Sequence, residues 1–402
     1  MGYNFDVIVA ARELVRSGTS VTTLNEYDSL CDEIAVSLVA TFERENVGLL
    51  VVENGTLPDN PIFTEALYRA IRTYGARRQF GKFVLWRDHD MMWSAEPHLY
   101  GVYPYAGVRR PDLNPHIHYA VLTEWMRTRM VAWSPGIVYH VISNRFFFPD
   151  IPQRTTRSIR ESCGIPANAY LFARCTRVIP QKSIERDLRL IDAVQRRIEA
   201  RGINKKVFLF VTGPKDEDPR EFARLCEVEQ TLSIAGQVIW GDGCLLPFNL
   251  SAISLPDEDP RFTIRDLVAD ADISSFLTTY DYEGFGNPPG EAMCMGTPFI
   301  ATTYELYHEV YGSKGAIAPL WWITATSSPS DPVPEDFVDW TFRVLEDAAY
   351  REQIIQKNLA VCQRYFSMEA LHNQLMEIFP LTKSTNYDAA ARPMETQQHQ
   401  ER

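Results

Sequence analysis

Residues 281–300 read DYEGFGNPPGEAMCMGTPFI, and this stretch decides how the rest of the chain is interpreted. It stands between two apolar runs, 273–277 and 298–302, whose pattern predicts short buried strands. Glu283 and Glu291 lie eight positions apart within it, in a loop rich in glycine and proline. Carboxylates in such a loop are well placed to accept hydrogen bonds from paired hydroxyls, such as a ribose diol.

The loop also favours an anion. Its glycines allow backbone N–H groups to approach a ligand closely. The proline pair predicts the first turn of a helix that begins near Gly290. The positive end of that helix would face the loop, which suits a phosphate group.

The surrounding chain alternates short apolar runs with amphipathic segments, a rhythm typical of parallel α/β sheets. The rhythm stops at a polar, proline-containing stretch, 149–168, and then restarts, so we expect two domains with a link between them. In open parallel sheets, ligands bind outside the carboxyl ends of the strands. The predicted domains are residues 1–150 and 165–365, and the tail 384–402 is expected to be disordered because it carries few apolar residues.

Several local features are predicted as well. The chain is expected to begin with a helix over 4–16 and a short strand over 21–24, and to end with a helix over 350–380. A Rossmann-type unit normally opens with a strand and a glycine-rich turn, so that first strand is expected to be missing or to lie upstream. The stretch 242–262 is too long for an ordinary connection and is interpreted as a lid or an interaction loop.

Composition excludes several classes of protein. The net charge of −12 over 402 residues argues against general nucleic-acid binding. The seven cysteines show no C-x-x-C spacing, which disfavours a zinc ribbon or a disulfide framework and fits a reducing compartment. No apolar run is long enough to span a membrane and no signal peptide is evident, so a cytoplasmic location is expected.

A basic cluster between Arg69 and Lys82 is interpreted first as a solvated helix face. Binding of an anionic acceptor or contact with a membrane surface stays open as a second interpretation of this cluster. A homodimer also stays open.

The segment Glu283-Gly-Phe-Gly286, a second Glu after seven residues, and then Ala-Met and Gly-Thr-Pro resemble a known signature. It is that of retaining GT-B glycosyltransferases, in particular the large fourth family of sucrose-synthase-like and mannosyltransferase-like enzymes. The resemblance implies two Rossmann-like domains around a cleft, with a nucleotide-sugar donor in the C-terminal one. It further implies that Glu283 orients the sugar, that Glu291 holds the ribose, and that Gly284, Phe285 and Gly286 line the diphosphate.

Other parts of the chain extend the resemblance. Arg177 and Lys182 occupy the places of the family's arginine and lysine that contact the donor diphosphate, and His89 matches the histidine that faces the donor sugar. The segment YHVISN resembles the strand that enters the linker, and NLAVCQRYFSMEAL resembles the last helices, so a helix over 366–382 is expected to return to the first domain. The sequence departs from the family in lacking its first strand and glycine loop before Gly2.

The implied reaction is sugar transfer with retention from a UDP-, GDP- or ADP-linked donor to an unidentified hydroxyl acceptor. Fixed cations would stabilise the leaving diphosphate, so neither a metal ion nor a separate cofactor is expected. One alternative is an inverting enzyme in which His89 acts as a base with Asp88 or Asp90. Another is an inactive nucleotide-sugar-binding subunit. A third is a metal-dependent transferase that uses Asp216-Glu-Asp218 or Asp257-Glu-Asp259.

Overall fold

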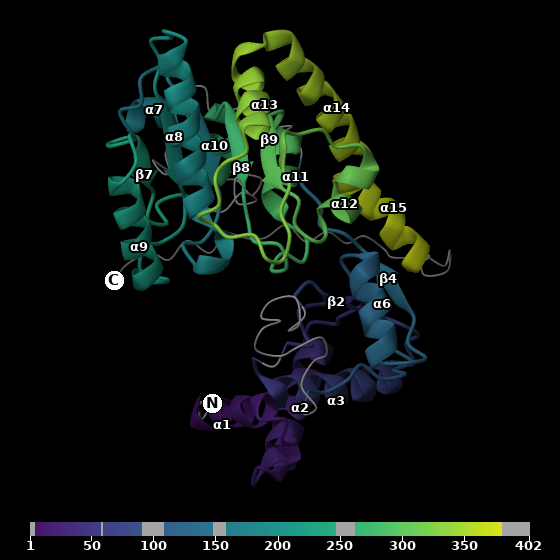
Figure 1. Cartoon of the computed structure of the whole chain (residues 1–402). Coiled ribbons are helices and arrows are strands. Elements are labelled where there is room, and N and C mark those ends of the chain that lie inside the picture. The colour runs from purple at the N-terminus through teal and green to yellow at the C-terminus, as the bar shows by residue number, and fades with distance from the viewer. Residues whose placement is uncertain (1–4, 58, 91–107, 148–157, 247–261, 380–402) are drawn as a thin grey trace, which may run out of the picture.

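The computed structural model describes residues 5–57, 59–90, 108–147, 158–246 and 262–379. These residues form two α/β units, each built on a parallel sheet, and the chain passes from the lower unit to the upper one in Figure 1. The predicted α/β class with two parallel sheets is confirmed. The segments 247–261 and 380–402 lie outside the described residues, and they include most of the predicted lid and the whole predicted tail.

The first sheet contains four parallel strands that follow one another in chain order. Its side chains alternate between two faces, as strand geometry requires. One face is buried under helices, where Tyr68 stacks on Trp86 with ring centroids 4.5 Å apart. The helices are α1 (Phe5–Arg16), α2 (Tyr27–Arg44), α3 (Pro61–Arg78) and α6 (Glu124–Trp133), and the strands are β1 (Leu50–Glu53), β2 (Val84–Asp88), β3 (Ile117–Val121) and β4 (Tyr139–Val141).

The second sheet contains six parallel strands in the order β10-β9-β8-β5-β6-β7. Helices α8 (Ile184–Ala200) and α13 (Glu335–Glu346) pack against one face, and α10 (Ile264–Asp270), α11 (Asn287–Met295) and α14 (Ala348–Phe366) against the other. The strands are β5 (Tyr170–Arg174), β6 (Val207–Val211), β7 (Val238–Trp240), β8 (Ile273–Phe276), β9 (Phe299–Thr302) and β10 (Leu320–Trp321). The shorter or outlying helices are α7 (Ile159–Ser162), α9 (Pro219–Gln230), α12 (Tyr307–Val310) and α15 (Met368–Ile378).

Two predicted elements were wrong in detail. The expected strand over 21–24 is a single 3-10 turn, Val21–Thr23, because the Ser20 hydroxyl accepts a hydrogen bond from the Thr22 N–H and so competes with strand pairing. The expected single helix over 350–380 is two helices, α14 and α15. Ser367 separates them, since its extended backbone ends α14 and its side chain caps α15 by accepting from the Ala370 N–H.

Three arginines of the basic cluster on α3 pair with carboxylates, Arg72 with Asp112 among them. Arg69 forms ion pairs with Asp28, Asp32 and Glu65, and Arg77 pairs with Glu43. This arrangement matches a solvated helix face. Within the described ranges, no helix has both the length and the hydropathy required to cross a membrane.

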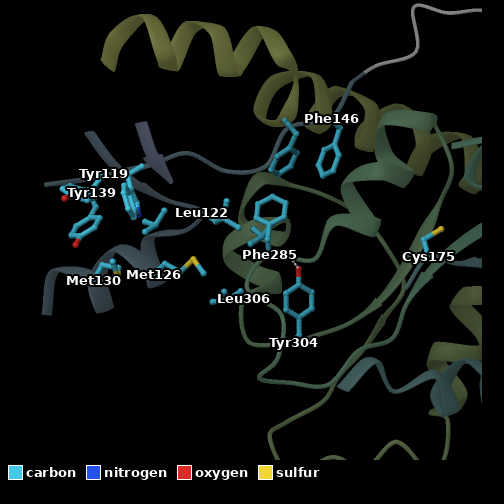
Figure 2. Packing of buried hydrophobic residues seen from close by; sticks show 14 of the residues in the cluster. Tyr119, Leu122, Met126, Met130, Tyr139, Phe146, Cys175, Phe285, Tyr304 and Leu306 are labelled. Carbon is cyan, nitrogen blue, oxygen red and sulfur yellow. Dashed lines mark hydrogen bonds between the residues drawn. The ribbon is translucent and has the colours of Figure 1, made fainter. Parts of the chain in front are cut away.

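The two units share a continuous apolar core. Figure 2 shows Leu122 and Met126 of the first unit close to Leu306 and Phe285 of the second, and all four belong to one buried cluster. Beside this core, the Glu309 carboxylate of α12 accepts hydrogen bonds from the first N–H groups of α6, with N–O distances of 2.6 and 3.2 Å. A carboxylate at a helix N-terminus is favoured by the unpaired N–H groups and the helix dipole.

Helix α15 crosses from the second unit to the first and lies on the sheet face that the other helices leave open (Figure 1). Ile378 packs into a small cluster with Leu85, Ala120 and Ile142, and Gln374 donates a hydrogen bond of 2.5 Å to the Val141 carbonyl. The helix therefore covers the part of this face formed by β2, β3 and β4.

A histidine pair lies at the end of α15 and makes stability depend on pH. His118 Nδ1 is 3.2 Å from His140 Nε2, and the Phe379 ring meets His118 edge-on. Burial, with the charges of Lys82 and His140, lowers the pKa of His118 from 6.5 to about 4. The unfolded chain therefore binds this proton at a higher pH than the folded chain, so stability is lost as the pH falls from about 6.5 towards 4.

We expect His118→Gln to remove part of this dependence, so that its melting temperature falls less than that of the wild type between pH 7 and pH 5 (~0.6 °C per 0.5 kcal/mol). Thermal melts across this range measure the difference, and His372→Gln, at an exposed position on α15, is the control. Parallel curves for wild type and His118→Gln would contradict the assignment.

Candidate active site

The loop after β8 holds the opening motif, and its glycines are required by close packing. Gly286 has φ +80°, and a Cβ there would lie 2.7 Å from the Phe276 ring. A Cβ on Gly290 would lie 2.0 Å from the Phe146 ring of the inter-domain link. Helix α11 begins at Asn287, about one turn earlier than the sequence predicted, and its first turn carries the two prolines.

Lys182 and Glu283 meet in this loop. Lys182 Nζ lies 2.5 Å from Glu283 Oε1, and the two side chains are only 12% and 9% exposed. Thr278 Oγ1 donates to the same carboxylate oxygen at 3.0 Å, and the Lys182 ammonium lies 4.8 Å from the centre of the Tyr282 ring. The structure thus brings together a cation and a carboxylate that the sequence assigned to the same ligand.

A buried ion pair supports the Lys182 segment, and sequence reasoning missed it. Arg174 Nε lies 3.0 Å from Asp187 Oδ2, and both side chains are fully buried. Arg174 also donates to the carbonyls of Lys182 at 2.6 Å and Ser275 at 3.2 Å. Burial raises the pKa of Asp187, although Arg174 and Ser275 act against the rise. The sequence did contain a sign of this buried pair, because Arg174 ends the otherwise apolar strand YLFAR and a charged residue there needs a partner.

Arg177 is half-exposed and also meets a carboxylate. Its Nη1 donates to Glu217 at 2.9 Å and its Nη2 to the Tyr282 hydroxyl at 3.1 Å. Burial raises the pKa of Tyr282; Arg177 opposes the rise, whereas the charges of Glu283 and Asp90 add to it. Asp90 belongs to the first unit, so the Tyr282 hydroxyl lies near that unit as well.

The three residues Gly284, Phe285 and Gly286 are buried. The Phe285 ring packs into the inter-domain core (Figure 2). Its carbonyl accepts from the Tyr304 hydroxyl, and the Gly286 carbonyl accepts from Tyr311, each at 2.5 Å. In the described part of the chain, nothing accepts from the N–H groups of residues 284–286.

His89 pairs with a residue that the sequence did not single out. Its Nε2 contacts Glu53, and Arg87 Nη1 lies 2.8 Å from the same nitrogen. Asp88 was considered as its partner, but Asp88 points to the opposite, buried face of β2, since strand side chains alternate. There it accepts hydrogen bonds from the N–H and hydroxyl of Thr56 at 3.1 and 2.7 Å.

The other candidate partner, Asp90, is also occupied elsewhere, because its carboxylate accepts from Asn54 Nδ2 at 3.2 Å. Burial acts to raise the pKa of Glu53, but the hydrogen bond from His89 and the charge of Arg87 outweigh it, so the pKa is lowered overall. Glu53 is therefore the anionic partner of His89.

Arg87 links this pair to the second unit. Its Nη2 donates to Asn144 Oδ1 at 2.6 Å, and Asn144 Nδ2 donates to Asn287 Oδ1 at 2.7 Å. Asn287 is the first residue of α11. A single polar chain thus joins His89 to the helix that follows the opening motif.

Glu291 lies in different surroundings from Glu283. It lines a pocket of about 420 Å³ together with Arg87, His89 and Asn287, and in the described part of the chain neither Arg177 nor Lys182 lines that pocket. Burial raises the pKa of Glu291 from 4.5 to about 7. Lys182 thus contacts the first motif glutamate, whereas the second lines a separate pocket.

This pKa makes a pH effect on stability testable. The folded chain holds the Glu291 proton between about pH 4.5 and 7 whereas the unfolded chain does not, so stability is lost as the pH rises through that range. Glu291→Gln cannot ionise. Between pH 5 and pH 8 we therefore expect its melting temperature, relative to that of the wild type, to rise by about 1 °C for each kcal/mol of stability that the wild type loses. The exposed Glu305→Gln is the control, and a difference that stays constant with pH would refute the expectation.

The acidic triplet after β6 has structural roles. Asp218 caps α9 by accepting from the N–H groups of Arg220 and Glu221 at 3.1 and 3.0 Å, and Glu217 holds Arg177. No cluster of three or more metal-ligating side chains occurs among the residues that the structure describes. The other triplet, Asp257-Glu-Asp259, lies outside them.

Comparison with solved structures identifies the fold family. No protein-family profile matches the sequence, and no curated protein matches it. A glycosyltransferase from Rickettsia africae matches in structure with a TM-score of 0.57 and 12% identity, covering 94% of each chain. Sucrose-phosphate synthase from Thermosynechococcus elongatus matches with 0.53 and 14%, covering 89% of this chain and 78% of that one.

HepE from Anabaena, solved in complex with UDP-glucose, matches with a TM-score of 0.53 and 14% identity over 86% of this chain and 81% of that one. The fold is GT-B. In this chain the loop after β8 and the segment after β5 both lie at the carboxyl edge of the second sheet. Lys182 and Glu283 meet at this edge.

Proposed function

We propose that this GT-B chain is a glycosyltransferase that moves a sugar from a nucleotide-diphosphate donor to an acceptor hydroxyl, with retention and without a metal ion. The observation that carries the proposal is the contact of Lys182 with Glu283 at the carboxyl edge of the second sheet. Neighbours of the same fold support it, because HepE was solved with UDP-glucose. The donor would lie between this edge and the first unit.

In this mechanism Arg177 and Lys182 are paired with carboxylates before the donor binds, and they bind the donor diphosphate afterwards. Arg177 and Lys182 are paired with Glu217 and Glu283, so a diphosphate would take the place of a carboxylate at each cation. Glu283, released from Lys182, would accept hydrogen bonds from the sugar hydroxyls. The N–H groups of 284–286 and the two cations would stabilise the negative charge that develops on the leaving phosphate.

With retention, the acceptor attacks from the side from which the diphosphate leaves, and the departing phosphate oxygen takes the acceptor's proton. His89, held by Glu53 and Arg87, would contact the sugar from the opposite wall of the cleft.

The contact between His89 and Glu53 favours a second candidate, an inverting enzyme. A histidine oriented by a carboxylate is the arrangement of a general base, and Glu53 would stabilise the imidazolium that forms. The anomeric configuration of the product, measured by NMR during the first turnovers, separates the two mechanisms.

Donor binding is the direct test. We expect UDP-, GDP- or ADP-glucose to raise the melting temperature, since a ligand that binds only the folded chain stabilises it. If none of the three does so at millimolar concentration, the proposed function is wrong. If one binds but its sugar is neither transferred nor hydrolysed, the chain is a binding subunit.

The ribose assignment is tested by Glu291→Ala. We expect it to weaken donor binding by about tenfold or more, because hydrogen bonds to a charged group contribute ~1.5–3 kcal/mol. Isothermal titration with the best donor gives the dissociation constants, and the exposed Glu305→Ala is the matched control. Equal constants for Glu291→Ala and wild type would rule out a contact between Glu291 and the ribose.

A further inference from the structure

One face of the first sheet is only partly covered. Helix α15 packs over β2, β3 and β4 on that face, whereas Val51 on the edge strand β1 stays 49% exposed and the adjacent Leu49 53%. The pocket that contains Glu291 opens at this place. Apolar side chains are thus exposed beside His89 at a point where the fold leaves room for a ligand.

The pocket changes character along the strands. Val51 and Glu53 point to the same face of β1, and Leu85, Arg87 and His89 follow one another on the same side of β2 and the loop after it. Each step of two residues advances about 6.6–7 Å along a strand. The floor is therefore apolar at one end and charged at the other, and the charged end is the one that meets α11 in the cleft.

Helix α15 supplies the opposite wall. Met368, Leu371 and Leu375 line the pocket, and their spacing of three and four residues places them on one side of the helix. Met368 is 37% exposed, so this wall also presents apolar surface that the protein does not bury. Leu375 lies nearest the apolar end with Val51 and Leu85, because the C-terminal end of α15 packs beside Leu85. Met368, at the start of α15, lies nearer the charged end.

We propose that this pocket binds the hydrocarbon part of the acceptor, so that the acceptor is an alcohol or glycoside carrying an alkyl group. The inference rests on the proposed transferase function and specifies its acceptor. The alkyl group lies between Val51 and Leu375, and the hydroxyl-bearing end lies at Arg87 and His89 beside the donor. A volume of about 420 Å³ is within the usual range of small-ligand pockets, ~300–1,000 Å³.

The test uses n-alkyl β-glucosides from butyl to octyl, each below its micelle concentration, titrated into the full chain without nucleotide. We expect the affinity to rise roughly two- to fourfold for each added methylene until the apolar end is filled. Val51→Glu places a charge at the apolar end and Val51→Trp fills that end, both at an exposed position where folding tolerates the change. Each should lower the octyl affinity roughly tenfold or more and the butyl affinity much less.

Val138→Glu is the matched control, because Val138 is 73% exposed and does not line the pocket. The proposal is overturned if affinity does not depend on chain length, or if both pocket variants bind octyl glucoside as Val138→Glu does. UDP, GDP and ADP titrated into the same proteins report on the donor site separately. Octyl binding without binding of any of the three nucleotides would keep the pocket assignment and refute the transferase function. Nucleotide binding without octyl binding would refute only the pocket assignment.

Discussion

Lys182→Ala is expected to lower kcat by about 10²–10³, because the developing charge on the leaving diphosphate would lose one preorganised cation. The same change leaves Glu283 almost fully buried without its ion-pair partner, since the two side chains are only 12% and 9% exposed. Removing one member of a buried pair costs more than the pair contributes, so the melting temperature should fall as well. Steady-state kinetics and thermal melts measure the two effects.

A double variant separates catalysis from stability. Lys182→Met with Glu283→Gln removes both charges, so it should recover much of the lost stability while kcat stays low. Thr278 can still donate to the glutamine oxygen at that position. Turnover within about threefold of the wild type in the folded Lys182→Ala protein would remove Lys182 from the mechanism, since such a change is under ~1 kcal/mol.

Arg174→Met is expected to destabilise the chain by about 3–5 kcal/mol, the usual cost of leaving one charge of a buried pair unpaired. Asp187 would remain buried, and the Lys182 carbonyl would lose a donor that now lies 2.6 Å away. Because that carbonyl belongs to the segment that positions the Lys182 ammonium, donor affinity should fall too. Urea denaturation and nucleotide titration measure the two losses.

Arg174→Met combined with Asp187→Leu removes both charges of this pair and should regain much of the stability, because an apolar pair of similar volume avoids the desolvation cost. A loss below about 1 kcal/mol in Arg174→Met alone would show that the pair does not support the site, because that is no more than an average substitution.

Much of the fold followed from local pattern. The apolar runs around 273–277 and 298–302 correspond to strands β8 and β9, since buried strands of a parallel sheet read as short apolar runs. The strand predicted at 21–24 failed because two hydroxyls form local hydrogen bonds there. The helical pattern alone continues through Ser367, where only the cap geometry reveals the boundary, whereas the helix that the resemblance implied over 366–382 corresponds to α15.

The site was predictable in part. Lys182 and Glu283 were assigned to one ligand by their motifs, and the structure places them in contact. The partners Glu217 of Arg177 and Glu53 of His89 were not predictable, because they lie 40 and 36 residues away in the chain, and the acidic triplet that contains Glu217 was considered only as a metal motif. Asp88 looked a better partner for His89 by proximity, but strand alternation turns it to the other face.

By itself the sequence determined two parallel α/β units and the residue types at the loop after β8, since periodicity and motif spacing are properties of neighbouring residues. Only the tertiary structure decided which carboxylate neutralises each cation, that Glu283 and Glu291 face different surroundings, and that α15 leaves part of the first sheet open. These features depend on which side chains meet after segments far apart in the chain have packed, and burial and charge are set by that meeting.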